Sequence, residues 1–367
     1  MKYRLRLAPK TKRNLSRILP FGIIWWACAL VFFITEMGVT RYQNLNPETD
    51  ITLSLPVIIF AHVLIFFIGL LVGTLEMVYL EKRFRHLSLR RKISYKFGIY
   101  FFLFLLVILT AYPIAACLES GLTLTDPQVW QKTGRFLGSL TFLTTLFQLS
   151  VSLFVSLVYS AISENLGHHV FLNFFTGKYH KPVVETRIFM FLDMKSSTSI
   201  AEKLGHVRYF QLLQEYYDLM SEPIINCEGE VYQYIGDEIV TSWRLDKGLA
   251  QANCIRCFFE IAKKMEEKQS RFKSEHGVEV GFKAGLHFGE VTIGEVGALK
   301  KEIVFTGDVL NTTARIQSMC NELHADLLIS EKLNNALLPH TYSIRSCGVV
   351  SLRGKDHKEE LFQVISP

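Results

Sequence analysis

The hydrophobic pattern divides the chain into two halves of different character. Apolar residues concentrate in the first half, where four long runs are separated by short polar or charged segments. A membrane-spanning helix needs about 20 predominantly apolar residues, and each run is close to that length or longer. The runs cover approximately residues 18–34, 55–80, 97–118 and 136–162. The pattern therefore predicts an α-helical membrane domain of four spans over residues 1–162.

The second half alternates between the periods of strands and helices. Apolar β-rich segments are predicted as strands, and segments with a period near 3.6 are predicted as helices. In chain order these are a strand at 187–193, a helix at 199–220, strands at 229–234 and 238–243, a helix at 248–272, strands at 278–287 and 290–294, a helix at 308–320, and strands at 342–352 and 361–365. The order β-α-β-β-α-β is the split βαβ pattern, which predicts an α+β ferredoxin-like domain over 183–367.

A helical linker is expected between the two domains, over residues 163–182. The helical pattern of the fourth apolar run continues beyond its end, and Gly177 and Pro182 indicate where the helix stops. Both a passive tether and an element that transmits motion to two paired subunits fit this pattern.

Positive charge flanks the apolar runs. The formal net charge is +6, and residues 1–17 and 81–96 each hold seven Lys or Arg residues with at most one acid. Cytoplasmic loops of membrane proteins carry such an excess, and anionic lipid headgroups attract it. We therefore expect a multi-pass protein of the cell (inner) membrane with both termini and the 183–367 domain in the cytoplasm. The lipid bilayer explains the charge without a nucleic acid polymer as partner.

Two aspartates are the first candidates for chemistry. Asp193 ends the first predicted strand of the second half, and Asp237 lies in the turn between the next two strands. In a split βαβ sheet both points fall on one edge, where two carboxylates repel each other unless a cation lies between them. Mg²⁺ and Mn²⁺ prefer oxygen ligands and bridge to phosphates, so the pair predicts a divalent metal site.

Small hydroxyl residues follow at the start of the predicted helix. Ser196, Ser197 and Thr198 stand where free backbone N–H groups can meet a triphosphate. A plain N-cap is the other interpretation of the same residues.

Four motifs follow one another through the second half of the chain. They are FLDMKSSTSIAEKLG, VYQYIGDEIVTSW, GLHFGEVTIGEVG and EIVFTGDVLNTTARIQ. Together they resemble the catalytic domain of the class III adenylate and guanylate cyclases, and the resemblance covers about residues 187–367. It implies that two Mg²⁺ or Mn²⁺ ions per site are held by Asp193, Asp237 and the backbone of Met194.

The resemblance also implies roles for residues nearer the C-terminus. Asn311 and Arg315, one helical turn apart, match the family's residues for the ribose and for the phosphate in the transition state, which come from the opposite subunit of a dimer. Lys355 matches a phosphate-binding lysine. The implied reaction is attack of the ribose 3′ hydroxyl on the α-phosphate of ATP in a homodimer, with release of pyrophosphate.

Two positions that contact the purine base depart from the family's usual residues. Gln233 stands where adenylate cyclases usually have Lys and guanylate cyclases Glu, and Val304 stands where Asp or Thr is frequent. A Gln amide can donate and accept, so it can meet either purine, whereas Val304 cannot hydrogen-bond through its side chain. The resemblance favours ATP as the substrate, because members of the family of bacterial type with a membrane domain are mostly adenylate cyclases. GTP is the alternative substrate.

Three other functions compete with a nucleotidyl cyclase. A diguanylate cyclase would need the GGDEF turn, which the segment 235–238 resembles only in part. A membrane receptor with a non-catalytic, nucleotide-binding cyclase-like domain fits the unusual base positions. Transport would need charged residues in the spans, and the nearest, Glu76, is expected at the cytoplasmic end of the second span within reach of water.

Overall fold

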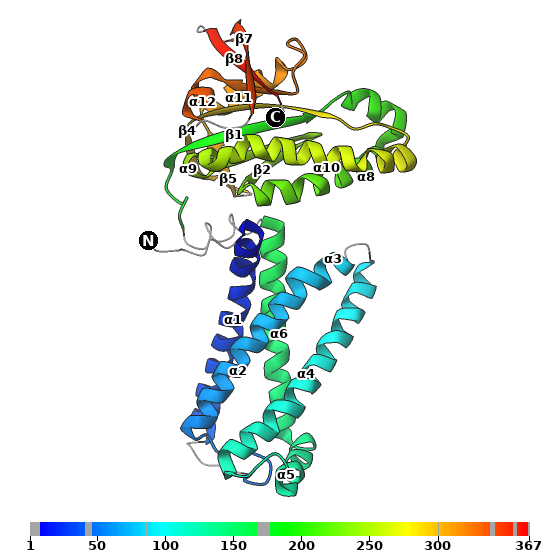
Figure 1. The fold of residues 1–367 in the computed structure, drawn as a ribbon. Coiled ribbons are helices and arrows are strands. Elements are labelled where there is room, and N and C mark those ends of the chain that lie inside the picture. The colour runs from blue at the N-terminus through cyan, green and yellow to red at the C-terminus, as the bar shows by residue number, and fades with distance from the viewer. Residues whose placement is uncertain are drawn as a thin grey trace. The chain divides into compact units, whose positions relative to one another are not determined.

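The computed structural model describes residues 8–40, 46–84, 87–166, 177–299, 301–337, 342–354 and 358–365. The chain divides into two compact units (Figure 1). One unit comprises residues 11–171, and the other comprises residues 172–367 with 1–10. Each unit has its own hydrophobic core.

The unit of residues 11–171 is helical. Its helices are α1 (Pro9–Thr40), α2 (Leu55–Thr74), the π-helix η1 (Leu75–Leu80), α3 (Glu81–Phe84), α4 (Leu89–Ser120), α5 (Pro127–Leu137) and α6 (Leu140–Leu166). The segments long and apolar enough to cross a membrane are Pro9–Gly38, Leu55–Leu80, Arg90–Ser120 and Leu140–Glu164. The prediction of four helices of membrane-spanning length is confirmed.

The start of the fourth span differs from the prediction. The apolar pattern predicts a span over 136–162, but α6 begins at Leu140 and a separate helix, α5, precedes it. The side chain of Asp126 accepts the backbone N–H of Gln128 (2.9 Å) and caps α5. Phe136 lies on the buried face of this amphipathic helix, so its apolar character reflects α5 and not the span.

An acidic side chain is buried at the end of the second helix of membrane-spanning length. Glu76 lies in η1 with only 4% of its surface exposed. It accepts a hydrogen bond from the Tyr100 hydroxyl (2.7 Å) and forms an ion pair with Lys96, both on α4. The expectation that Glu76 reaches water is therefore wrong, because partners on α4 compensate its charge inside the protein.

Helices α1 and α2 approach each other closely at a glycine. A Cβ on Gly69 would lie 2.8 Å from the carbonyl oxygen of Phe21 and 2.8 Å from the Cβ of Trp25. Small residues allow membrane helices to pack this closely. Trp25 also donates from Nε1 to Oγ of Ser156 on α6 (2.9 Å). One crossing therefore joins three of the four helices of membrane-spanning length.

The Gly69→Ala substitution should destabilise this crossing because the added methyl group meets α1. We expect the apparent Tm of the full-length protein in detergent to fall, by an amount that corresponds to about 1–3 kcal/mol of overpacking. Gly98→Ala in α4 is the matched control, since a Cβ there meets nothing within 4 Å. An unchanged Tm for Gly69→Ala would contradict the close crossing.

The other unit is built on one mixed sheet. Its strands are β1 (Val183–Met194), β2 (Glu230–Ile235), β3 (Glu238–Arg244), β4 (Phe282–Val296), β5 (Glu302–Thr306), β6 (Leu327–Ser330), β7 (Ser343–Ser351) and β8 (Lys358–Ile365). The order is β2-β3-β1-β4-β6-β8-β7, with β5 paired to β4. The pair β4–β6 is parallel and the other pairs are antiparallel. The arrangement β2-β3-β1-β4 is the split βαβ sheet, which confirms the predicted ferredoxin-like fold.

Helices pack on both faces of this sheet. They are α8 (Ser197–Asn226), α9 (Leu245–Leu249), the 3-10 helix η2 (Ala250–Ala252), α10 (Asn253–His276), α11 (Asp308–Ser318) and α12 (Glu331–Ala336). α8 and α10 lie side by side (Figure 1) and bury Ile188 and Met190 of β1. The alternate residues Phe189 and Phe191 pack in a second cluster with Val309 of α11. β1 is covered on both faces, which explains its continuous apolar sequence.

One long strand replaces two predicted ones. The pattern predicts strands at 278–287 and 290–294, but β4 runs without interruption and pairs with the whole of β1. Gly289 lies inside it, where a Cβ would be 3.2 Å from the Cβ of Val309. Glycine here makes room for α11 and does not end the strand.

The predicted helical linker is described only at its ends. α6 continues through Leu166, and residues 167–176 lie outside the described residues. Residues 177–180 form a turn, in which His180 N–H donates to the carbonyl of Gly177 (3.1 Å). Tyr179 in this turn is buried with the Phe189 cluster. A helix between these ends, and its stop near Gly177, stay predictions.

Candidate active site

The end of β1 places Asp193 among polar partners. The residue opposite in β4 is Lys283, whose Nζ lies 3.5 Å from Oδ2 of Asp193. The Gln317 side-chain amide, on α11, donates to the same oxygen (3.1 Å). Gly285 allows α11 this close, because a Cβ there would clash with the backbone of Gln317. Lys283 and Gln317 are not among the residues predicted for the site, since only strand register and helix packing bring them to Asp193.

The β2–β3 hairpin places Asp237. Gly236 and Asp237 form a two-residue turn between the strands. Gly236 has a φ of 63°, the left-handed conformation that hairpin turns favour at their first central residue. The Tyr217 hydroxyl, on α8, donates to the carbonyl of Gly236 (2.6 Å). This hydrogen bond fixes the turn against α8.

The two aspartates meet, as the sequence predicts; we call them the carboxylate pair. Burial, together with the hydrogen bond and charge of Asp237, raises the pKa of Asp193. Burial and the charges of the same two aspartates raise the pKa of the adjacent Glu238 to about 7. Three acidic groups therefore lie close together in one half-buried site. Among the described ion pairs, Lys283 is paired with Asp193 only, so a further cation or shared protons must offset the remaining repulsion.

One buried oxygen of the pair is a suitable ligand atom for a divalent cation. Within the described part of the chain, Oδ2 of Asp237 is buried and has no hydrogen-bond partner. A buried polar atom without a partner costs free energy, and a carboxylate oxygen suits a hard cation. Met194, whose backbone is the third predicted ligand, follows Asp193 as the last residue of β1. The donor set is oxygen only, which fits Mg²⁺ or Mn²⁺.

The start of α8 is not capped by a side chain. Ser196 adopts a left-handed φ of 55° and makes no side-chain cap hydrogen bond, so the plain N-cap interpretation does not hold. Ser197 begins the helix, and Thr198 is exposed. The first N–H groups of a helix have no partner within it. The turn after the carboxylate pair can therefore present N–H donors to an anion.

Asn311 and Arg315 lie one turn apart on α11. Asn311 is exposed and Arg315 is half-buried. A Cβ on Gly354 would lie 3.4 Å from Nη2 of Arg315, so the guanidinium lies against the turn after β7. Lys355, the next residue, lies outside the described residues. Among the ion pairs that the structure describes, none joins Arg315 to the carboxylate pair of its own chain.

The two predicted base positions lie on strands that touch. Gln233 is exposed on β2, and Val304 is half-buried on β5. Their neighbours Tyr232 and Phe305 stack with ring centroids 4.5 Å apart and planes 4° apart. The backbone N–H of Phe305 also donates to the Tyr232 hydroxyl (3.2 Å). Both base positions therefore belong to one chain and one region of the sheet.

A second cluster of possible metal ligands lies on α8 and α10. Glu215, Glu275 and His276 offer possible ligand atoms within 4.8 Å of one another. Arg271 is already ion-paired with both glutamates, at 3.8 and 2.9 Å. The carboxylate pair also has a cationic neighbour, Lys283, but within the described residues the buried Oδ2 of Asp237 has no hydrogen-bond partner.

Comparison with known proteins decides the family. The family model described as the adenylate and guanylate cyclase catalytic domain matches residues 180–366, just over half of the chain. The chain belongs to this cyclase family. It is 36% identical over 198 residues to Adenylate cyclase 2 of Rhizobium meliloti (strain 1021), which covers 54% of each chain. It is 29% identical over 182 residues to human Retinal guanylyl cyclase 2, covering 48% of this chain and 16% of that protein.

A solved cyclase structure agrees on the fold. A structure titled as a bacterial light-regulated adenylyl cyclase superposes with a TM-score of 0.53 at 19% identity, covering 62% of this chain and 67% of that chain. At this identity the likeness concerns the fold alone. The chain spans about half the length of Adenylate cyclase 2 and a smaller share of human Retinal guanylyl cyclase 2.

A divalent cation should stabilise the protein through the carboxylate pair. We expect saturating Mn²⁺ to raise the Tm of the full-length protein, since a ligand at 100 times its Kd contributes about 2.7 kcal/mol. Asp237→Asn should remove most of this increase, yet keep the metal-free Tm at or above that of the wild type because one like charge is gone.

Asp246→Asn is the control for this measurement. Asp246 is an exposed carboxylate on α9, 3.6 Å from Arg244, and its loss should leave the Mn²⁺ effect intact. An equal Mn²⁺ effect in wild type and Asp237→Asn would mean that the cation binds elsewhere.

Proposed function

We propose that this chain is a membrane-anchored adenylate cyclase that converts ATP into cyclic AMP and pyrophosphate for intracellular signalling. The observation that carries the proposal is the carboxylate pair with its unpartnered Asp237 oxygen. Membership of the cyclase family and the similarity to a curated adenylate cyclase support it.

The residues around the carboxylate pair would divide the chemistry among them. Two bound Mg²⁺ or Mn²⁺ ions would activate the attacking hydroxyl and neutralise the triphosphate. Asp193, Asp237 and the backbone of Met194 would hold these ions. The N–H groups at Ser196, Ser197 and Thr198 would bind the triphosphate, together with Lys355.

In the reaction, the ribose 3′ oxygen forms a bond to the α-phosphorus, and the bond to pyrophosphate breaks. Arg315 would stabilise the charge on the transferring phosphoryl group, for which a fixed guanidinium suits. Asn311 would orient the ribose from the same face of α11.

The positions of these residues support a homodimer with two composite sites. Asn311 is exposed, and the Arg315 guanidinium lies against its own β7–β8 turn and not on its own carboxylate pair. One chain therefore offers a metal half-site and a separate Asn311–Arg315 half-site. Two chains paired about a twofold axis would complete both.

Substrate choice rests on Gln233 and Val304. The Gln233 amide can donate and accept, so the side chain itself admits ATP and GTP. We propose ATP because the relative with 36% identity is an adenylate cyclase. Guanylate cyclase activity is the second candidate, since Val304 offers neither purine a polar partner.

The membrane arrangement completes the proposal. The four apolar helices would anchor residues 1–162 in the cell membrane with both termini in the cytoplasm, as the basic flanks indicate. Residues 163–182 would link this anchor to the catalytic domain at 183–367.

A product assay tests the activity directly. Purified full-length protein with Mn²⁺ should form cyclic AMP from ATP, and form it faster than cyclic GMP from GTP. Asp193→Ala should lower the rate by about 100-fold or more, as expected when an essential electrostatic contact to the transition state is lost. Binding of both nucleotides without any cyclic product would favour the non-catalytic receptor instead.

Complementation tests the composite site. Co-expressed Asp237→Ala and Arg315→Ala chains should recover about a quarter of wild-type activity per chain, since half of randomly formed dimers are mixed and each has one intact site. Each variant alone should be inactive. A mixture that stays inactive, although differently tagged chains co-purify, would exclude shared sites.

A further inference from the structure

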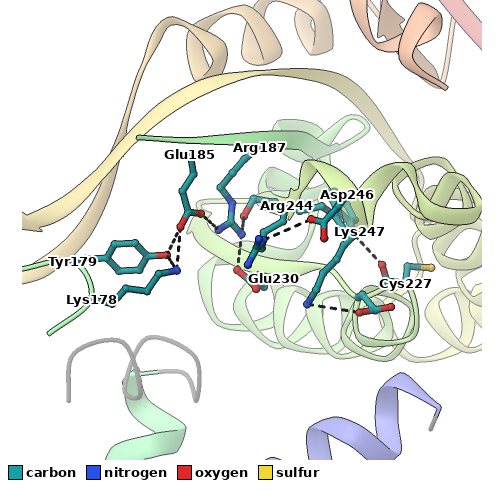
Figure 2. A network of polar contacts seen from close by, with 12 residues as sticks. Lys178, Tyr179, Glu185, Arg187, Cys227, Glu230, Arg244, Asp246 and Lys247 are labelled. Carbon is teal, nitrogen blue, oxygen red and sulfur yellow. Dashed lines mark hydrogen bonds and ion pairs between the residues drawn. The ribbon is translucent and has the colours of Figure 1, made fainter. Parts of the chain in front are cut away.

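A charged side chain lies buried in the centre of the sheet, away from the carboxylate pair. Arg187 in β1 is 3% exposed. Its guanidinium donates to Oε2 of Glu185 (3.2 Å), to Oε2 of Glu230 (2.5 Å) and to Oγ of Ser242 (3.1 Å). Figure 2 shows Arg187 between the two glutamates. Hydrogen bonds between ionised partners are stronger than neutral ones and fix geometry.

The first partner, Glu185, holds the end of the linker. Its Oε1 accepts from Nζ of Lys178 (3.0 Å) and from the Tyr179 hydroxyl (3.2 Å). Although burial acts in the opposite direction, these donors and the charge of Arg187 keep the pKa of Glu185 below its usual range. Tyr179 is itself buried, and its carbonyl accepts the backbone N–H of Glu295 (3.1 Å). The chain leaving the linker is therefore attached to Arg187 through Glu185 (Figure 2).

The second partner, Glu230, is the first residue of β2, the strand that carries Gln233. Between them the strand has a β-bulge, because Val231 pairs with Thr241 while Gln233 pairs with the adjacent Val240. A bulge changes the direction of a side chain. Tyr232, which lies between Val231 and Gln233 at the bulge, stacks on Phe305.

The Arg187 guanidinium also lies over the Phe305 ring, 5.2 Å from its centroid. A cation at this distance is attracted to the face of an aromatic ring. Phe305 neighbours Val304, and it is joined to Tyr232 by ring stacking and by the hydrogen bond from its backbone. Arg187 thus contacts both elements that carry the predicted base positions.

We infer that Arg187 is a positioning residue for the purine site and that it couples this site to the end of the linker. The inference rests on the proposed function and names a determinant of base recognition within it. Arg187 does not touch the nucleotide. It fixes the separation of β2 and β5, so that Gln233 and Val304 meet the base at one spacing, and Glu185 makes that spacing depend on the linker turn.

A test needs a substitution that weakens this network and leaves the charge in place. Lys keeps the charge but has no planar fork, so Arg187→Lys cannot hold both glutamates and cover Phe305 in the same way. Phe305→Leu is the second variant, since it keeps an apolar side chain and removes the stacking and the cation–π contact. Arg244→Lys is the matched control, because Arg244 is the residue opposite Arg187 in β3 and is ion-paired with Asp246.

The measurements distinguish an effect on binding of the base from an effect on binding of the triphosphate. Full-length wild type and variants are assayed with Mn²⁺ for KM and kcat with ATP and with GTP, and for competitive inhibition by inorganic tripolyphosphate, which has no base. Tm values from the same preparations show whether each variant is folded.

We expect Arg187→Lys and Phe305→Leu to raise the KM for ATP by about fivefold, as for the loss of one net hydrogen bond. The ratio of kcat/KM for ATP to that for GTP should also change. Inhibition by tripolyphosphate should stay within about twofold of wild type, a change of about 0.4 kcal/mol, because this inhibitor has no base. Arg244→Lys should change neither quantity.

Other results would overturn the inference. If both variants fold and keep the wild-type ATP-to-GTP ratio, Arg187 does not position the purine site. If tripolyphosphate inhibition weakens as much as the KM rises, the effect is a general loss of structure. A wild type that forms no cyclic nucleotide from either substrate would instead reject the proposed function, and the inference with it.

Discussion

The repulsion between Asp193 and Asp237 is the constraint on which the catalytic unit depends. Two carboxyl groups and the neighbouring Glu238 share one half-buried place, and burial with their mutual charge raises the pKa of Asp193 and Glu238. A fold does not maintain such a place for its own stability, because apolar residues would pack there at lower cost. The arrangement is understandable as a site that a cation completes.

The scaffold holds the pair at a fixed separation. β1 and β3 are paired along six residues, so the end of β1 and the turn of the hairpin cannot move independently. Tyr217 holds the turn from α8, and Gln317 holds Asp193 from α11. The same α11 carries Asn311 and Arg315. A shift of this helix would therefore act on both half-sites of a chain together.

The parts that the sequence predicts well are those that depend on local pattern. Neighbouring residues are enough to predict the four apolar runs, the split βαβ order and the Gly-Asp turn. The strand order and the turn together bring Asp193 and Asp237 to one edge of the sheet. Three other features cannot be predicted in this way. They are the pairing of Glu76 with Lys96, the clash that Gly69 avoids, and the contact of Gln317 with Asp193. Each joins elements far apart in sequence, so it depends on helix packing or strand register.

The Arg187 network shows the same limit. In the sequence, Arg187 is an ordinary residue at the start of an apolar strand. Its contacts with Glu185, Glu230 and Phe305 are visible only in the structure. The short strands β5 and β6 also lack a pattern of their own, because four or five residues carry too little periodicity. They form where β4 offers them an edge.

Anomalous diffraction from crystals of the protein with Mn²⁺ and 3′-deoxy-ATP, which lacks the attacking hydroxyl, tests the central claim most directly. We predict anomalous peaks within ligand distance of carboxylate oxygens of both Asp193 and Asp237, with Asn311 and Arg315 of the partner subunit facing the same nucleotide. Peaks only at the Glu215–Glu275–His276 cluster, or a bound nucleotide with no anomalous peak at Asp193 and Asp237, would contradict it.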